Sequence, residues 1–201
     1  MSHYCSTSFC NVYRVVLYRG RVRADATRNL ERVLTTGARL LADDPAASLT
    51  AIAAAAGVDR RTVYRRFASR EELLAAVYQA RYDAVEQAIA AAQLREAPVE
   101  VALHRYVEGI ITVNRTWPVE TGRLRTEKSI LPRRRLIDEV DAFIQRATDE
   151  GLLRPDLPPG WVSALLPPLM HNAAEALPHL TPAQAADVVV DTLLHGTGRG
   201  A

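Results

Sequence analysis

Apolar and small residues recur at helical spacing along most of the chain from Arg23 onward. The first such run falls at positions three or four apart and ends before Asp43: Leu30, Val33, Leu34, Gly37, Ala38 and Leu41. This spacing gives a helix one side that can enter a core. No convincing run of alternating β-branched residues competes with it. The sequence therefore predicts an all-α protein.

Two short helices are predicted on either side of Gly57, a turn residue that accepts positive φ. Ser48 is a suitable N-cap for the first, and Asp59 is one for the second, which continues to about Phe67. Two short helices around a glycine turn form a helix-turn-helix. We expect it to belong to a three-helix N-terminal domain over residues 22–70.

Ser69 and Glu72 form a predicted capping box that opens a long helix after this domain. The rest of the chain, residues 71–201, is expected to be a second helical domain. Helices are predicted over 98–114, 120–128, 133–150, 161–177 and 182–195. Within 161–177, Pro167 and Pro168 should kink or interrupt the helix.

The second short helix has a predictable inner and outer side. Val63 and Phe67 are four residues apart and define the buried side, which places Arg61, Thr62 and Arg65 opposite and Tyr64 at the edge. Arg61 and Arg65, four residues apart on the helix, repel each other by about 0.3 kcal/mol. A polyanion bound to this face would relieve that repulsion.

Residues 59–70 form the densest basic patch, with five arginines against the single acid Asp59. Guanidinium groups bind phosphates and guanine edges, and hydroxyl groups donate to the DNA backbone. Arg70 adds charge near the free N–H groups of a helix start. We therefore expect double-stranded DNA as a partner, with these contact residues: Arg60, Arg61, Thr62, Tyr64, Arg65 and Arg70.

Residues 49–74, LTAIAAAAGVDRRTVYRRFASREELL, resemble the DNA-binding signature of TetR/AcrR-type bacterial transcriptional repressors. The shared features are Ala-Gly-Val before the turn, Thr-Val-Tyr, Phe67, and a basic residue before Glu-Glu-Leu-Leu. The resemblance implies that the helix ending at Phe67 reads DNA, that Thr62 and Tyr64 contact phosphate, and that Arg70 anchors the backbone. The family usually has Ser where Asp59 stands and Lys where Arg70 stands.

The same resemblance implies a ligand-responsive repressor that binds a palindromic operator as a homodimer. The dimer would form through helices 161–177 and 182–195, whose apolar character also suggests a partner surface. A small-molecule effector would bind among the middle helices and release the DNA. Large or polar residues there are the candidate pocket: His104, Tyr106, Asn114, Trp117, Phe143 and His171.

Residues 1–21 differ from the rest of the chain. They hold both cysteines and four of the twelve aromatic residues but no acid. They lack the apolar core and cleavage site of a signal peptide. We expect an unstructured extension or untranslated upstream sequence, with translation beginning near Val22. A basic arm that enters the minor groove is the alternative.

We expect no catalytic activity, no bound cofactor and no bound metal ion. The pairs His104/Glu108 and His171/Glu175 lie on single helix faces, but no third ligand has a telling spacing. The apolar runs are too short for a membrane span, so we expect a cytoplasmic protein that joins the nucleoid when bound to DNA. Two alternatives stay open: a constitutive DNA binder without effector, and a helical enzyme or binding module that lost DNA contact.

Overall fold

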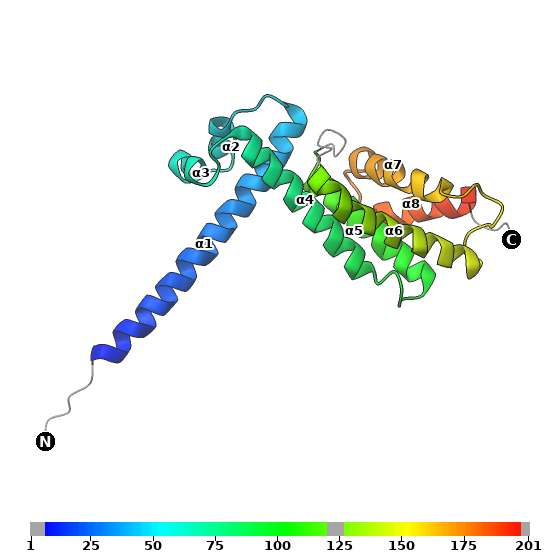
Figure 1. Ribbon diagram of the computed structural model, residues 1–201, viewed down its shortest axis with the longest axis horizontal. Helices are drawn as coiled ribbons and strands as arrows, with labels where there is room; N and C mark the ends of the chain where they lie inside the picture. Colours follow the sequence, from blue (N-terminus) through cyan, green and yellow to red (C-terminus); the bar gives the residue numbers. More distant parts are fainter. Residues whose placement is uncertain (1–6, 120–126, 198–201) are drawn as a thin grey trace, which may run out of the picture.

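The protein is all-α over the residues that the computed structural model describes, 7–119 and 127–197, with side-chain detail for 25–119 and 134–196. Eight helices and no strand lie in these ranges (Figure 1). The first is α1 (Thr7–Asp43), a long helix that projects from the rest of the molecule. The predicted fold class is confirmed.

The N-terminal helices α2 (Leu49–Ala55) and α3 (Arg60–Arg66) pack beside the C-terminal part of α1 and the beginning of α4 (Arg70–Ala92). We call this part the head. Its apolar core draws on all four helices: Val33, Leu41, Leu49, Ile52, Val63, Phe67, Leu73 and Val77. Helices as short as α2 and α3 are not stable alone in water, so packing in this shared core stabilises them.

Side-chain N-caps begin three of the head helices, as the sequence predicts. The side chains of Ser48, Asp59 and Ser69 accept hydrogen bonds from backbone N–H groups of α2, α3 and α4. Gly57 has φ +61° in the turn between α2 and α3. The predicted helix-turn-helix is therefore confirmed in its turn and in both caps.

Residues 7–21 are helical in the structure, as the first part of α1. This differs from the unstructured extension expected from composition. Helical backbone here is compatible with the sequence, because residues 7–19 contain neither proline nor glycine.

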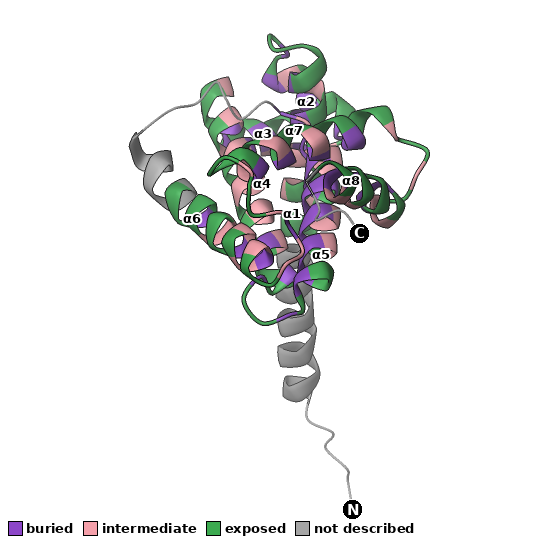
Figure 2. Ribbon diagram, turned by 90° about the vertical axis from the view of Figure 1, so that its right-hand side faces the viewer, coloured by how far each residue is buried: buried purple, intermediate pink, exposed green. Residues whose placement is uncertain are grey.

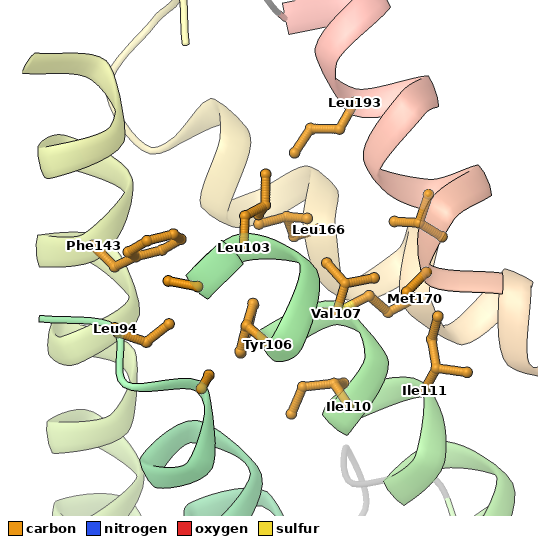
Figure 3. Packing of buried hydrophobic residues seen from close by; sticks show 14 of the residues in the cluster. Leu94, Leu103, Tyr106, Val107, Ile110, Ile111, Phe143, Leu166, Met170 and Leu193 are labelled. Carbon is orange, nitrogen blue, oxygen red and sulfur yellow. The ribbon is translucent and has the colours of Figure 1, made fainter. Parts of the chain in front are cut away.

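The remaining helices surround α5 (Val99–Thr116), which contacts α4, α6 (Glu127–Asp149), α7 (Trp161–Ala176) and α8 (Pro182–Thr197). The core between them is built from large aliphatic residues with two aromatic ones (Figure 3): Leu94, Leu103, Tyr106, Val107, Ile110, Ile111, Phe143, Leu166, Met170 and Leu193. Buried residues concentrate on the facing sides of these helices, and exposed residues cover the outer sides (Figure 2). We call this part the body.

Gly109 allows α4 and α5 to approach closely. A Cβ atom built at Gly109 would lie 3.0 Å from the Cβ atom of Ala88 on α4. That distance leaves no room for a larger side chain at either position. Two small residues therefore set the spacing of the helices that join the head to the body.

Two predicted breaks between or within helices of the body are not found in the described residues. The helix containing Pro167 and Pro168 runs without interruption from Trp161 to Ala176. Both prolines are exposed while Leu166 and Met170 beside them are buried, so tertiary packing maintains the helix despite the missing donors. The break predicted between residues 128 and 133 is absent, because one helix runs from Glu127 to Asp149. The rest of the helix predicted at 120–128 lies outside the described residues.

The head core leads to a stability prediction. Phe67→Ala should lower the free energy of unfolding of the head by about 3 kcal/mol or more, because it removes a buried aromatic ring and leaves a cavity. Arg61→Ala, on the exposed side of the same helix, should change it by less than about 0.5 kcal/mol. Urea unfolding followed by circular dichroism measures both. Equal losses in the two variants would contradict the facing of α3.

Candidate nucleic-acid interface

The helix α3 presents one side to the core and the other to solvent. Val63 and Phe67 are 2% and 6% exposed, whereas Arg61 and Arg65 are exposed and Thr62 is half-buried. The predicted facing of this helix is confirmed. It follows from the four-residue spacing of the two apolar side chains.

Three arginines on α3 have no hydrogen bond or ion pair with any residue of the described part of the chain: Arg61, Arg65 and Arg66. All three are exposed. Arg66 was counted in the basic patch but was not among the predicted DNA contacts. Unpaired guanidinium groups on one short helix form a surface that favours phosphate groups.

Tyr64 connects α3 to α2. Its hydroxyl lies 3.1 Å from Oγ1 of Thr50, and this hydrogen bond lowers the pKa of the Tyr64 hydroxyl below its usual value. The Arg60 guanidinium lies over the Tyr64 ring, 5.0 Å from its centroid. This cation–π contact holds Arg60 near the exposed face of α3. The Tyr64 side chain is 42% exposed and remains accessible to a DNA backbone.

Arg70 binds backbone carbonyls of the head. Its Nε donates to the carbonyl of Ala47 at 3.1 Å, and its Nη2 donates to the carbonyl of Pro45. Both acceptors lie in the loop between α1 and α2. These two bonds use two of the five N–H groups of the guanidinium, and the role of Arg70 as a DNA backbone anchor, which the resemblance implied, stays a prediction.

Arg32 on α1 is a head residue that sequence reasoning missed. Its Nη2 donates to the carbonyl of Ala56 at 2.5 Å, at the C-terminal end of α2. A Cβ atom built on Gly57 would lie 2.9 Å from the same nitrogen. No local pattern reveals this contact, because its two partners are 24 residues apart.

A hollow in the body lies between α5 and α7 and has a volume of about 250 Å³. Two of the predicted pocket residues, Asn114 and His171, line it, together with Arg115, Pro118, Ala174, Glu175 and Pro178. Asn114 is buried and its Oδ1 accepts from Nη2 of Arg81 on α4 at 3.0 Å. A hydrogen bond therefore links the lining of the hollow to α4, the helix that leads to the head.

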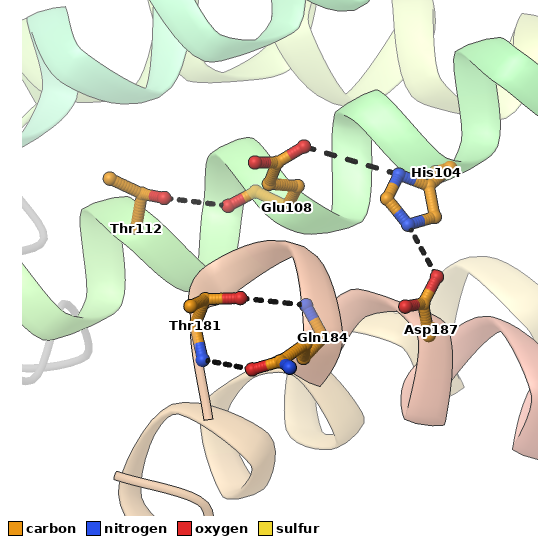
Figure 4. Close-up of polar contacts among 6 residues, drawn as sticks. All are labelled: His104, Glu108, Thr112, Thr181, Gln184 and Asp187. Atoms are coloured by element: carbon orange, nitrogen blue, oxygen red, sulfur yellow. Dashed lines mark hydrogen bonds and ion pairs between the residues drawn. The ribbon is translucent and has the colours of Figure 1, made fainter. Parts of the chain in front are cut away.

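The other predicted pocket residues lie elsewhere. Tyr106 and Phe143 pack in the body core, where burial raises the pKa of the Tyr106 hydroxyl to about 12. Trp117 is buried in the apolar core of the head. His104 forms a contact of 2.9 Å from Nε2 to Oδ1 of Asp187 and so joins α5 to α8 (Figure 4).

The two His/Glu pairs are ordinary neighbours on helix faces. His104 and Glu108 are 4.0 Å apart, and His171 and Glu175 are 3.4 Å apart, in each case from a ring nitrogen to a carboxylate oxygen. Among the described residues, no group of three or more His, Cys, Asp or Glu side chains could hold a metal ion. No helix in that part of the chain has the length and apolar character needed to cross a membrane.

Comparisons with known proteins agree with this geometry. The model of a family described as bacterial regulatory proteins, tetR family, matches residues 33–77, which span the helix-turn-helix. The HTH-type transcriptional repressor LfrR of Mycolicibacterium smegmatis is 33% identical over 174 residues, which cover 84% of this chain and 90% of LfrR. The chain belongs to the TetR family.

Solved structures of TetR-family regulators share the fold. The TetR-like regulator LfrR from Mycobacterium smegmatis in complex with proflavine has a TM-score of 0.63 at 28% identity, covering 87% of this chain and 99% of LfrR. The ketosteroid regulator KstR2 of Mycobacterium tuberculosis has a TM-score of 0.69 at 18% identity, covering 84% and 94% of the two chains. This TetR-family chain is thus a DNA-binding transcriptional regulator, and the sequence-based resemblance is confirmed.

The unpaired arginines of α3 lead to a binding prediction. Arg61→Ala or Arg65→Ala should weaken operator binding and reduce the slope of log K against log [salt] by about 0.9 for each lost phosphate contact. The melting temperature should stay within about 1 °C of the unmodified protein, because both side chains are exposed. Fluorescence anisotropy at several salt concentrations measures the slope. An unchanged affinity in both variants would remove these residues from the interface.

Proposed function

We propose that this TetR-family regulator is a ligand-responsive repressor that binds a palindromic operator as a homodimer. The observation that carries the proposal is the face of exposed, unpaired arginines on α3, held outward by the buried Val63 and Phe67. The assignment as a repressor is supported by the likeness to LfrR, a transcriptional repressor. Direct DNA contacts are proposed for Arg60, Arg61, Thr62, Tyr64, Arg65 and Arg70.

The proposed dimer uses the outer sides of α7 and α8. Each carries an exposed large hydrophobic residue: Trp161 is 50% exposed and Val188 is 45% exposed. A second copy packed on these helices would remove both from water. A two-fold dimer would then place two copies of α3 about 34 to 36 Å apart, which is one turn of DNA.

The division into a DNA-binding domain over 22–70 and an effector and dimerisation domain over 71–201 is kept as a proposal. It is supported by two separate apolar cores, one in the head and one in the body. The helix α4 contributes to both, with Leu73 and Val77 in the head core and Ile89 in the body core. A change in the body could therefore reach the head through α4.

We propose the hollow between α5 and α7 as the effector site. The complex of LfrR with proflavine supports a small-molecule ligand for a protein of this fold. At about 250 Å³ the hollow is smaller than pockets for drug-sized ligands, which begin at about 300 Å³, so binding must widen it. Widening at Asn114 would alter its hydrogen bond to Arg81 and so the position of α4. An effector releases DNA only if it prefers the conformation that binds DNA less well.

A regulatory function is proposed in place of an enzymatic one. The two His/Glu pairs are solvent-facing neighbours on single helices, and such pairs are common without catalysis. We also propose that the protein associates with the nucleoid when bound to DNA. A salt-dependent gel shift on palindromic DNA tests this function against a helical protein that has lost DNA contact.

The dimer proposal predicts a change in oligomeric state. Val188→Asp should shift the protein from dimer to monomer, because a buried unpaired carboxylate costs several kcal/mol, on the order of 3 or more. Ile137→Asp is the matched control, since Ile137 is 55% exposed on α6, outside the proposed interface. Size-exclusion chromatography with light scattering measures the mass. A dimeric Val188→Asp variant would contradict the proposed surface.

The effector proposal predicts that proflavine, used as a probe, raises the melting temperature and releases labelled operator DNA. Glu175→Gln should weaken proflavine binding by about tenfold while operator affinity stays unchanged, because Glu175 lines the hollow in the body and is not part of the exposed face of α3. Stabilisation without DNA release, for proflavine and a wider compound screen, would favour a constitutive DNA binder.

A further inference from the structure

We propose that the head contains a small-molecule site of its own, between α1 and α3, which binds a small amphipathic anion and excludes operator DNA when it is occupied. We call this site the head hollow. It is lined by residues within 26–33 of α1, by Val58 in the turn, and by residues within 62–67. The exclusion of DNA rests on the proposed operator binding, whereas the binding of the anion does not.

The head hollow lies where α1 and α3 diverge. Both helices pack against α2, and α1 also packs against α4. Leu30 and Val33 of α1 line one side of the space between them, and Val63 and Phe67 line the other. The volume is about 420 Å³, compared with about 250 Å³ for the hollow between α5 and α7. Pockets for small molecules begin at about 300 Å³, so the head hollow can accept one without widening.

The inner part of the head hollow is apolar. Leu30, Val33, Val58, Val63 and Phe67 supply this surface. Val33, Val63 and Phe67 are buried members of the head core, which holds them in place before any ligand binds. Removing apolar surface from water contributes about 25 cal/mol per Å². The inner part therefore favours the apolar body of a ligand.

The outer part is polar and cationic. Arg65 and Arg66 are exposed and have no hydrogen bond or ion pair with the described residues, while Asn29 and Thr62 are half-buried and add an amide and a hydroxyl. None of the described residues that line the head hollow is acidic. Guanidinium groups bind carboxylate, sulfonate or phosphate groups through paired N–H donors. The outer part therefore favours an anionic group.

The two parts together select an amphipathic anion. The phosphate groups of DNA can bind the two arginines, but a phosphate has no apolar part that would cover the inner surface. An uncharged apolar molecule would cover that surface and leave the guanidinium groups without a partner. A small aromatic or aliphatic molecule with one anionic group satisfies both.

Such a ligand and operator DNA need the same side chains. Thr62 and Arg65 are proposed DNA contacts, and Arg66 lies exposed beside them. An anion held here would occupy their donors and neutralise their charge, so binding of the two should be mutually exclusive. An effector in the body acts differently, because it changes operator affinity only by the limited factor that couples two separate sites.

Fluorescence titration of the free full-length protein tests the class of ligand. Anilinonaphthalene sulfonate has an aromatic body and one anionic group, and uncharged anilinonaphthalene is its matched control. The sulfonate should bind at least about tenfold more tightly, as expected for one charged hydrogen bond. Arg66→Gln should weaken sulfonate binding by about the same factor and leave the uncharged probe unaffected. Equal affinities of the two probes for the unmodified protein would overturn the assignment of an anion.

A filling substitution tests where the probe binds. Ala26 is exposed and lines the head hollow, so the indole of Ala26→Trp should fill the space and weaken sulfonate binding at least about tenfold. Ala42→Trp is the matched control, because Ala42 is an exposed residue of α1 outside the head hollow. If Ala26→Trp and Arg66→Gln both bind the sulfonate as tightly as the unmodified protein, the probe binds elsewhere and the inference is overturned.

Fluorescence anisotropy with labelled operator DNA tests the exclusion. The apparent Kd for DNA should rise in proportion to the sulfonate concentration without reaching a plateau, and Ala26→Trp should remove this dependence relative to its own Kd without probe. A plateau that persists in Ala26→Trp would show an effect transmitted from the body and overturn the exclusion. If the unmodified protein binds no palindromic DNA, the proposed function fails, and the titration of the free protein still decides whether the head hollow binds an anion.

Discussion

Arginine side chains hold the loops that follow four of the helices, and the arrangement of the bundle depends on these contacts. Arg70 binds the loop after α1, Arg32 the end of α2, Arg146 the carbonyls of Leu94 and Ala97 after α4, and Arg115 those of Leu177 and Leu180 after α7. None of these four helices has a basic residue in its own last turn. A guanidinium carries several N–H groups in a fixed plane and can bind two carbonyls at once, which one lysine ammonium does less well. Each contact satisfies carbonyl groups at a helix end and fixes one helix against another.

These contacts change the meaning of the charge pattern. The sequence indicates a uniform cationic surface at residues 59–70, but in the structure the arginines of this patch have different partners. Arg70 binds backbone carbonyls, Arg60 lies over the Tyr64 ring, and Arg61, Arg65 and Arg66 stay unpaired within the described residues. A guanidinium without protein partners can orient all five N–H groups toward a phosphate, whereas one that is bound to two carbonyls keeps its charge but has three N–H groups left. Within the described residues, the partners of the arginines therefore divide the patch into guanidinium groups that contact the protein and guanidinium groups that do not.

Features set by neighbours in sequence were predictable, and those set by distant partners were not. The caps at Ser48, Asp59 and Ser69 and the facing of α3 were predicted because capping and helical periodicity act over three or four residues. The hydrogen bonds of Arg32, Arg70 and Arg115 join residues 23 to 65 positions apart, so no local pattern shows them. The prolines do not interrupt α7, because burial of Leu166 and Met170 outweighs two lost donors. The predicted pocket residues were chosen by size and polarity alone, and most are needed by the core or by contacts between helices.

The helix α4 limits how a change in the body can reach the head. Its first residue, Arg70, is bound to the loop before α2, and Arg146 binds the residues just after its last turn. In its C-terminal part, Ala88 meets Gly109 of α5 so closely that α4 cannot move toward α5 at that point. Movement of α4 must therefore be a rotation about this contact or a slide along it. Arg81 lies seven residues, about two turns, before Ala88 on the side of the head, and its bond to Asn114 opposes such a rotation. Loss of the Asn114 bond would weaken this link, while the bond from Nη1 of Arg81 to the carbonyl of Trp117 at 3.3 Å would still join the two helices.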